Sequence, residues 1–261
     1  MATADRTWRF DALTRDDLSQ LASRATVVVP LGSTEQHAHH LPVRTDAAVV
    51  TAIAERAVEL AAAHELVLLA PTLPFGFAHH HVPFGGTISL SSTTYLNVLT
   101  DIVTTLSREG FRRVVLLNGH GGNEAAARLA ADRLGYELQL DVHVAVGSYW
   151  TLAAKFLETV DLPSGLVPGH AGHFETSIML ALSPETVRLD ARVSDTEPTT
   201  PLGLPEHAGA HVRRPDLWES SDGRTDDAGL ADANLGKQIL AGIVESVADF
   251  LVQFHQSAGG E

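Results

Sequence analysis

Residues 25–46 read ATVVVPLGSTEQHAHHLPVRTD, and this stretch decides the fold because a buried strand leads directly into a cluster of polar side chains. The apolar, β-branched run 25–31 predicts a strand covered on both faces. Glu35 and His37 follow the end of that run, and alternate side chains of an extended segment point the same way. Asp46 then opens a helical pattern. A carboxylate, an imidazole and a second carboxylate that can bridge two ions suit zinc or manganese, so this stretch predicts a hydrolytic metal site.

Outside this stretch, apolar strand patterns alternate with helical patterns. Further strands are expected at 65–70, 113–117 and 138–146, and helices at 46–64, 91–109, 124–134, 151–159, 175–182 and 230–254. This alternation predicts an α/β fold, a three-layer α/β/α sandwich around a mainly parallel sheet. We expect one domain over residues 1–261. The long loop 195–227 is a candidate lid or subunit contact, with a plain surface excursion as the alternative.

The composition narrows the classes of function. The chain has 261 residues, a formal net charge of −14 and no cysteine. The acidic balance disfavours nucleic acid or an anionic membrane as a partner, because phosphate groups would be repelled. Without cysteine, any metal must be held by nitrogen and oxygen ligands. The sequence shows no signal peptide and no apolar run long enough to span a membrane, so we expect a cytoplasmic protein.

A second polar cluster follows the strand expected at 113–117. There the run 118–123, NGHGGN, presents His120 between glycines that let the backbone approach a ligand closely. Because the carboxyl ends of parallel strands meet at one edge of a sheet, we expect His120 to lie beside Glu35 and His37. The alternatives are a plain turn, or a phosphate-binding loop at a helix N-terminus. The dinucleotide pattern G-x-G-x-x-G does not fit, because Glu124 stands where its third glycine would be.

A third cluster is the run 170–177, HAGHFETS. His170 is a candidate proton shuttle or donor to the transition state, and Glu175 a candidate metal ligand or general base. The alternative is that Glu175 only begins an apolar helix, and that Asp46 likewise only caps one. A carboxylate buried in an apolar helix is costly unless it is paired or bound to metal, which favours the functional interpretation.

Two further candidates concern the substrate. His80 belongs to a triple histidine, 79–81, on a loop rich in proline and glycine, and is a candidate substrate contact. For any one of these histidines, a solvated loop position is the simpler interpretation. Trp150 follows the strand expected at 138–146 and forms either a pocket wall or part of the core.

Together these motifs resemble the creatininase family of metal-dependent amidohydrolases. The resemblance runs in order over roughly residues 8–190 and rests on GSTEQH with Asp46, PFGGTISL (83–90), NGHGGN, SYW (148–150) and HAGHFETS. It implies a creatininase-like three-layer fold, one or two divalent ions, and a homo-oligomer, often a hexamer. The ion is expected to be Zn²⁺, with Mn²⁺ or Fe²⁺ as alternatives. By motif, the resemblance implies metal ligands at Glu35, His37, Asp46 and His120 and a catalytic histidine at His170, and Glu175 matches the carboxylate of the family's ETS motif.

Three positions depart from creatininase itself. Where creatininase has an aromatic substrate contact, a metal-binding glutamate and a catalytic glutamate, this chain has Gly121, Gly122 and Gly169. Gly121 is therefore taken as a substrate-facing position, whereas Trp150 is retained. These departures disfavour creatinine as the substrate. The NGHGGN form resembles two other branches of the family, the enzyme that trims the mycofactocin precursor peptide and a pyrimidine-ribotide deformylase. His173 leans toward the peptide-trimming branch.

The function expected from these residues is hydrolysis of a non-standard C–N bond in a small molecule or short peptide: a cyclic amide, a formamide or a peptide-terminal amide. A metal-activated water attacks the carbonyl carbon. His170 stabilises the developing oxyanion. Glu175 carries a proton to the leaving nitrogen, unless it is a metal ligand. The alternatives are a mycofactocin-precursor-type peptidase within the family, a metal- or ligand-binding protein without turnover, and a phosphoester enzyme that uses the glycine-rich loop as an anion site.

Overall fold

The fold is built on a parallel sheet, seen in a computed structural model that describes residues 8–194 and 218–258. Four strands pair in the order β2-β1-β3-β4, all parallel. Their bounds are Thr26–Leu31 for β1, Val67–Leu69 for β2, Arg113–Asn118 for β3 and His143–Ser148 for β4. Most of the loop expected at 195–227 lies outside the described residues. The α/β fold with a parallel sheet, expected from the sequence, is confirmed.

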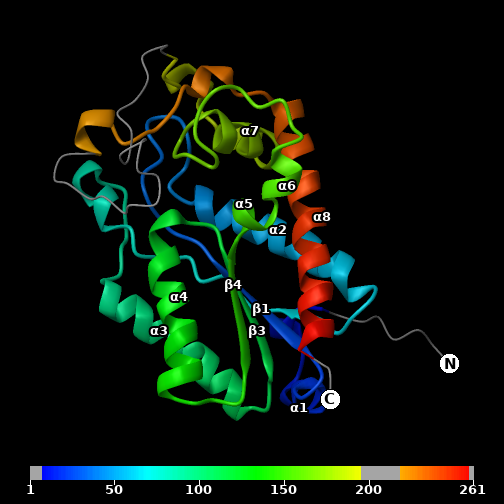
Figure 1. Cartoon of the computed structure of the whole chain (residues 1–261). Helices are drawn as coiled ribbons and strands as arrows, with labels where there is room; N and C mark the ends of the chain where they lie inside the picture. The colour runs from blue at the N-terminus through cyan, green and yellow to red at the C-terminus, as the bar shows by residue number, and fades with distance from the viewer. Residues whose placement is uncertain (1–7, 195–217, 259–261) are drawn as a thin grey trace.

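Helices cover both faces of the sheet, which gives three layers (Figure 1). One layer contains α2 (Thr45–Ala62), α7 (His173–Leu182) and α8 (Ala233–Ser257), together with the short helices α5 (Tyr149–Leu152) and α6 (Ala154–Leu157). The other contains α3 (Ser92–Arg108) and α4 (Glu124–Asp132); α1 (Arg15–Leu21) lies near the N-terminus. The alternation of β1 explains the two cores, because Val28 faces the first layer while Val27 and Val29 face the second.

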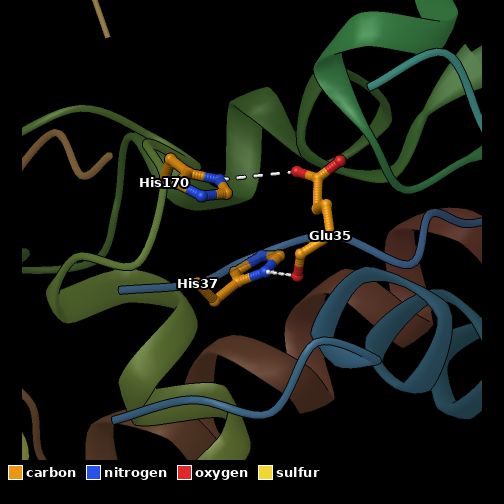
Figure 2. Close-up of side chains that lie close together, drawn as sticks. All are labelled: Glu35, His37 and His170. Atoms are coloured by element: carbon orange, nitrogen blue, oxygen red, sulfur yellow. Dashed lines mark hydrogen bonds and ion pairs between the residues drawn. The ribbon is translucent and has the colours of Figure 1, made fainter. Parts of the chain in front are cut away.

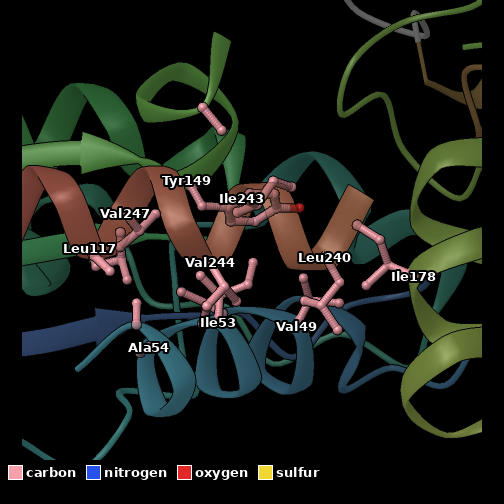
Figure 3. Packing of buried hydrophobic residues seen from close by; sticks show 14 of the residues in the cluster. Val49, Ile53, Ala54, Leu117, Tyr149, Ile178, Leu240, Ile243, Val244 and Val247 are labelled. Carbon is pink, nitrogen blue, oxygen red and sulfur yellow. The ribbon is translucent and has the colours of Figure 1, made fainter. Parts of the chain in front are cut away.

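The long helix α8 supports the layer that carries the site. Its N-cap Asp232 accepts hydrogen bonds from Asn234 N and Leu235 N, both at 2.9 Å. Gly236 packs on α7 so closely that a Cβ there would collide with Ser177 O, which requires glycine. Figure 3 shows the resulting apolar contact, in which α8 lies across α2 through residues that include Leu240, Ile243, Val244, Val49 and Ile53. In the described residues, no helix combines the length and apolar character needed to cross a membrane.

Several element boundaries differ from the sequence expectations, each for a local reason. The strand expected at 138–146 begins only at His143, because Arg133–Glu137 forms a π-helical turn that Leu138 N closes onto Arg133 O at 2.9 Å. The strand expected at 65–70 is reduced to Val67–Leu69 at the sheet edge. The helix expected at 151–159 is divided into α5 and α6, and the C-terminal helix starts at Ala233 rather than 230.

The register of the strands positions the functional residues. Leu31 of β1 pairs with Asn118 of β3, and Asn118 pairs with Ser148 of β4. The three strands therefore end side by side. The segments that follow them carry Glu35, His120 and Trp150 to the same edge of the sheet, as expected for a parallel α/β fold.

Candidate active site

The first group of the site joins residues that follow two different strands. His120 Nδ1 lies 3.2 Å from Glu35 Oε1 and 3.0 Å from Asp46 Oδ2. All three side chains are buried, and their ligand atoms lie within 4.8 Å of one another. The expectation that His120 meets the residues after β1 is thus met in the structure, with one imidazole and two carboxylates around one point.

A second group shares Asp46 with the first. His37 Nε2 lies 3.0 Å from Asp46 Oδ1 and 3.7 Å from Glu175 Oε2. These three side chains also bring ligand atoms within 4.8 Å of one another. Asp46 therefore directs one oxygen to each group, the arrangement by which a carboxylate bridges two cations.

Asp46 does not act as the helix cap that the sequence also allowed. The N-cap of α2 is Arg44, which makes no capping side-chain bond, and Asp46 lies in the first turn. Thr45 Oγ1 instead donates to Pro42 O at 2.7 Å. The carboxylate of Asp46 is thereby left to the two histidines, His37 and His120.

The buried carboxylates of the site, Glu35, Asp46 and Glu175, need protons or a cation to neutralise them. Glu35 Oε1 and Asp46 Oδ2 are buried, and their polar neighbours among the described residues are histidine ring nitrogens at 3.0–3.6 Å. Burial lowers the pKa of His37, but the carboxylates of Asp46 and Glu175 outweigh it and raise that pKa to about 10. Burial raises the pKa of Glu175 to about 8. In the metal-free protein, protons thus take the place that a cation would fill, because buried carboxylates must be neutralised.

His170 approaches the same point from a different segment (Figure 2). Its Nδ1 lies 3.6 Å from Glu35 Oε1, and its ring centroid lies 4.3 Å from that of His37. The backbone N of His170 donates to Thr225 Oγ1 at 2.6 Å, and Thr225 N donates to His170 O at 3.0 Å. Burial, aided by His37 and His81, holds the pKa of His170 well below its usual range. His170 is therefore a fixed, neutral imidazole at the edge of the two groups.

A cavity of about 330 Å³ opens over these residues. The expected substrate-facing residues, His80, Gly121 and Trp150, all line it, together with Asp46, His81, Gly119, His120, Gly122, Glu124, Leu166, Val167, Pro168, Gly169, His170, Glu175 and Trp218. Every site residue expected from the sequence thus either belongs to the two groups or borders the cavity above them.

Glycines in the loop after β3 are required by packing. A Cβ at Gly119 would lie 2.5 Å from Val50 Cβ, and one at Gly122 would collide with Phe77 O and His120 Nε2. The position of Gly122 therefore has no room for a carboxylate in this chain. Gly121 differs, because a Cβ there would meet nothing within 4 Å and the residue faces the cavity.

Three site residues were missed by sequence reasoning. His81 Nε2 lies 3.2 Å from Glu35 Oε1, and the Gln36 amide nitrogen lies 2.8 Å from His81 Nδ1. The ring of Trp218 lies edge-on to His81, with centroids 4.6 Å apart. The triple histidine signalled a cluster without telling which member faces inward. No local pattern indicated Gln36, because strict alternation in an extended segment would point its side chain away from those of Glu35 and His37. Trp218 was missed because it lies far along the chain from the other site residues.

The structure is an α/β protein with an all-parallel sheet, and buried histidines and carboxylates that could hold a metal ion lie beyond the ends of its strands. The family model described as creatininase, creatinine amidohydrolase, matches residues 11–251. The chain belongs to the creatininase family, and it is an amidohydrolase that acts on carbon–nitrogen bonds other than ordinary peptide bonds.

Individual relatives agree with this assignment. The chain is 34% identical to a mycofactocin precursor peptide peptidase of Mycobacterium tuberculosis over 87% of this chain and 85% of the relative. It is 33% identical to the creatinine amidohydrolase of Pseudomonas putida over 87% of this chain and 89% of the relative. The solved structure "Creatininase Mn" superposes with a TM-score of 0.78 at 30% identity, covering 95% of this chain and 98% of that one. The family and the two residue groups support a divalent metal ion as the cofactor.

Proposed function

We propose that the two groups hold two divalent ions bridged by Asp46. Glu35, Asp46 and His120 would hold one ion, and His37, Asp46 and Glu175 the other. The observation that carries this proposal is the division of the Asp46 carboxylate, with Oδ1 at 3.0 Å from His37 and Oδ2 at 3.0 Å from His120. Each position offers one imidazole and two carboxylates, a borderline donor set that suits Zn²⁺, with Mn²⁺ and Fe²⁺ as alternatives.

In this proposal Glu175 is a ligand rather than the carrier of a proton. Its Oε2 already accepts a hydrogen bond from Ala171 N at 2.7 Å and lies 3.7 Å from His37 Nε2. In this proposal Glu175 supplies the carboxylate that Gly122 cannot supply in this chain. Proton transfer then falls to His170, which borders both the cavity and Glu35.

The reaction that this arrangement supports is hydrolysis of an amide-type bond. Ions held there would acidify a water and polarise a carbonyl. His170 would exchange the proton between that water and the leaving nitrogen. The side chains of Trp150 and Trp218 line the cavity and would contact the substrate. At the three glycines 121, 122 and 169, backbone atoms rather than side chains face the cavity.

The lining of the cavity narrows the proposed substrate. Gly169 adopts a left-handed conformation with φ of +67°, and a Cβ there would collide with Asp226 Oδ2, so the glutamate of creatininase has no counterpart here. Outside the two metal groups, Glu124 is the acidic side chain among the described lining residues, and they include no lysine or arginine. A neutral formamide or peptide-terminal amide therefore fits better than creatinine or an anionic substrate.

Two broader expectations also remain proposals. We propose a homo-oligomer, a hexamer by family resemblance, and a cytoplasmic location in keeping with the net charge of −14 and the absence of cysteine. Both rest on the sequence.

Replacement of His120 by alanine tests the proposed site. It removes the imidazole between Glu35 and Asp46, so metal uptake and amide hydrolysis are expected to disappear together. Metal content would be measured by elemental analysis after incubation with Zn²⁺, and activity on a panel of formamides, lactams and short peptides.

The matched control is His143→Ala, since His143 is exposed at the opposite end of the sheet. That variant should retain the metal content and the activity of the parent protein. A His120→Ala protein that remained loaded with metal and active would refute the assignment.

A further inference from the structure

The side-chain amide of Gln36 lies between the two cavity histidines, and its orientation is fixed by the backbone. Ala38 N donates to Gln36 Oε1 at 2.8 Å, and Gln36 Nε2 donates to Gly223 O at 2.8 Å. A backbone N–H can only donate and a carbonyl can only accept, so the oxygen and nitrogen of this amide are assigned without ambiguity. The amide is buried, which keeps water from replacing these partners.

The backbone carbonyl of the same residue fixes the proton of His170. His170 Nε2 lies 2.9 Å from Gln36 O. Because that oxygen only accepts, His170 Nε2 must carry a proton. In the neutral ring the other nitrogen, Nδ1, then carries a lone pair. This lone pair faces Glu35 Oε1, a second acceptor, at 3.6 Å.

The remaining hydrogen of the Gln36 amide fixes His81. Gln36 Nε2 has two hydrogens, and one is used by Gly223 O. The other could reach His81 Nδ1 at 2.8 Å or His170 Nε2 at 3.1 Å. His170 Nε2 already carries a proton, so the hydrogen goes to His81 Nδ1. The ring proton of His81 therefore sits on Nε2, at 3.2 Å from Glu35 Oε1.

We propose that Gln36 is a positioning residue that fixes the ring protons of two stacked histidines, His81 and His170. One ring then presents a donor and the other an acceptor beside Glu35 Oε1. The rings of His81 and His170 lie 4.1 Å apart at 18°. Beside Glu35 Oε1, His81 presents an N–H while His170 presents a lone pair. The site thus holds one donor and one acceptor ready before substrate binds.

The catalytic meaning of this pair rests on the proposed function. His170 Nδ1 takes a proton from the attacking water as its O–H bond breaks and the water oxygen forms a C–O bond to the carbonyl carbon. The same proton passes to the leaving nitrogen as the C–N bond breaks, which returns His170 to its starting state. The N–H of His81, 3.2 Å from Glu35 Oε1, holds that carboxylate in place beside the reacting groups. Because Gln36 also bonds to Gly223 O, the segment from Trp218 onward is tied to this pair.

The proton positions can be measured directly by NMR. In protein labelled with ¹⁵N in the histidine rings, long-range ¹H–¹⁵N spectra distinguish the two neutral tautomers. His81→Gln and His170→Gln proteins, each lacking one ring, assign the two signals. We expect both rings to be protonated at Nε2 and unprotonated at Nδ1 in the metal-free protein. A His81 ring protonated at Nδ1, or a His170 ring unprotonated at Nε2, would overturn the proposal.

Variants of Gln36 show whether it sets these positions. Gln36→Glu keeps the shape but replaces the donor by an acceptor, so His81 Nδ1 should become protonated. Gln36→Met removes the donor and should leave His81 without a fixed tautomer. In both, metal content should persist, whereas kcat should fall about 10- to 100-fold, as is typical when the partner of a site residue is lost. A His81 tautomer unchanged in both variants would contradict the assigned role.

The NMR result does not depend on activity. If the wild-type tautomers are as expected but no amide is hydrolysed, the proposed function fails while the role of Gln36 stands. If hydrolysis occurs with other tautomers, the role of Gln36 fails and the proposed function stands.

Discussion

Asp46→Asn is expected to remove both ions at once and to lower kcat/KM by at least about 1,000-fold, because metal-ion catalysis is worth several kcal/mol and each 1.4 kcal/mol is tenfold. Asp46 is the residue shared by the two groups. Asparagine keeps the size of the side chain but offers one oxygen and one NH₂, so it cannot accept from both sides. Elemental analysis and kinetics on Zn²⁺-reconstituted protein measure the two effects together.

The control for this variant is Asp16→Asn. Asp16 also lies in the first turn of a helix, α1, but is exposed to solvent. It separates the loss of a bridging ligand from the loss of a negative charge at a helix N-terminus. An Asp46→Asn protein that still bound two ions per chain would show that this carboxylate does not bridge them.

Glu175→Gln is expected to remove one ion and leave the other. The amide oxygen of glutamine can still accept from Ala171 N, so the start of α7 keeps its hydrogen bond. The position between Glu35, Asp46 and His120 keeps all its ligands. Metal content should therefore fall from two ions to one per chain, with a large loss of kcat. Retention of both ions would show that Glu175 is not a metal ligand.

The same variant has an expected effect on stability that runs with pH. Burial raises the pKa of Glu175 from 4.5 to about 8 in the folded, metal-free protein. Between these values the folded state binds more protons at this group than the unfolded state, so its contribution to stability decreases as pH rises. Glutamine removes that penalty. In the presence of a chelator, the Tm of Glu175→Gln relative to the parent protein should therefore increase from pH 5 to pH 9.

The predicted pH dependence of the Tm difference needs a matched control variant. Glu185→Gln changes an exposed glutamate just beyond the end of α7 and should show no such trend. A Tm difference for Glu175→Gln that stayed flat across this range would mean that Glu175 is not a buried, protonated carboxyl.

The sheet edge and the types of residue that gather there could be predicted from the sequence, because both follow from local patterns. The run 25–31 is apolar apart from Thr26 and rich in β-branched residues, which favours a buried strand, and strands of a parallel sheet end together. That was enough to bring Glu35, His37 and His120 to one place. The boundary of β4 was wrong by five residues, because Leu138 and Leu140 are apolar but close a π-helical turn rather than extend a strand.

The features of the site that could not be predicted from the sequence depend on contacts between segments that are distant along the chain. Asp46 could cap a helix or face the two groups of candidate ligands. The position of His37 and His120 in the folded chain decides between these alternatives. The role of Gln36 depends on Gly223 and His170, which lie more than a hundred residues away. Only the folded chain distinguishes His81, which faces Glu35, from His79, which bonds to Ser89 at the surface.

The claim on which the account depends is that Asp46 bridges two divalent ions. Anomalous diffraction at the zinc edge, from crystals grown with Zn²⁺, tests it most directly. The account predicts two peaks on either side of the Asp46 carboxylate. One should lie within about 2.0–2.2 Å of ligand atoms of Glu35 and His120, the other within the same distance of His37 and Glu175. Peaks confined to the triple histidine at 79–81, with none in reach of Asp46, would contradict it.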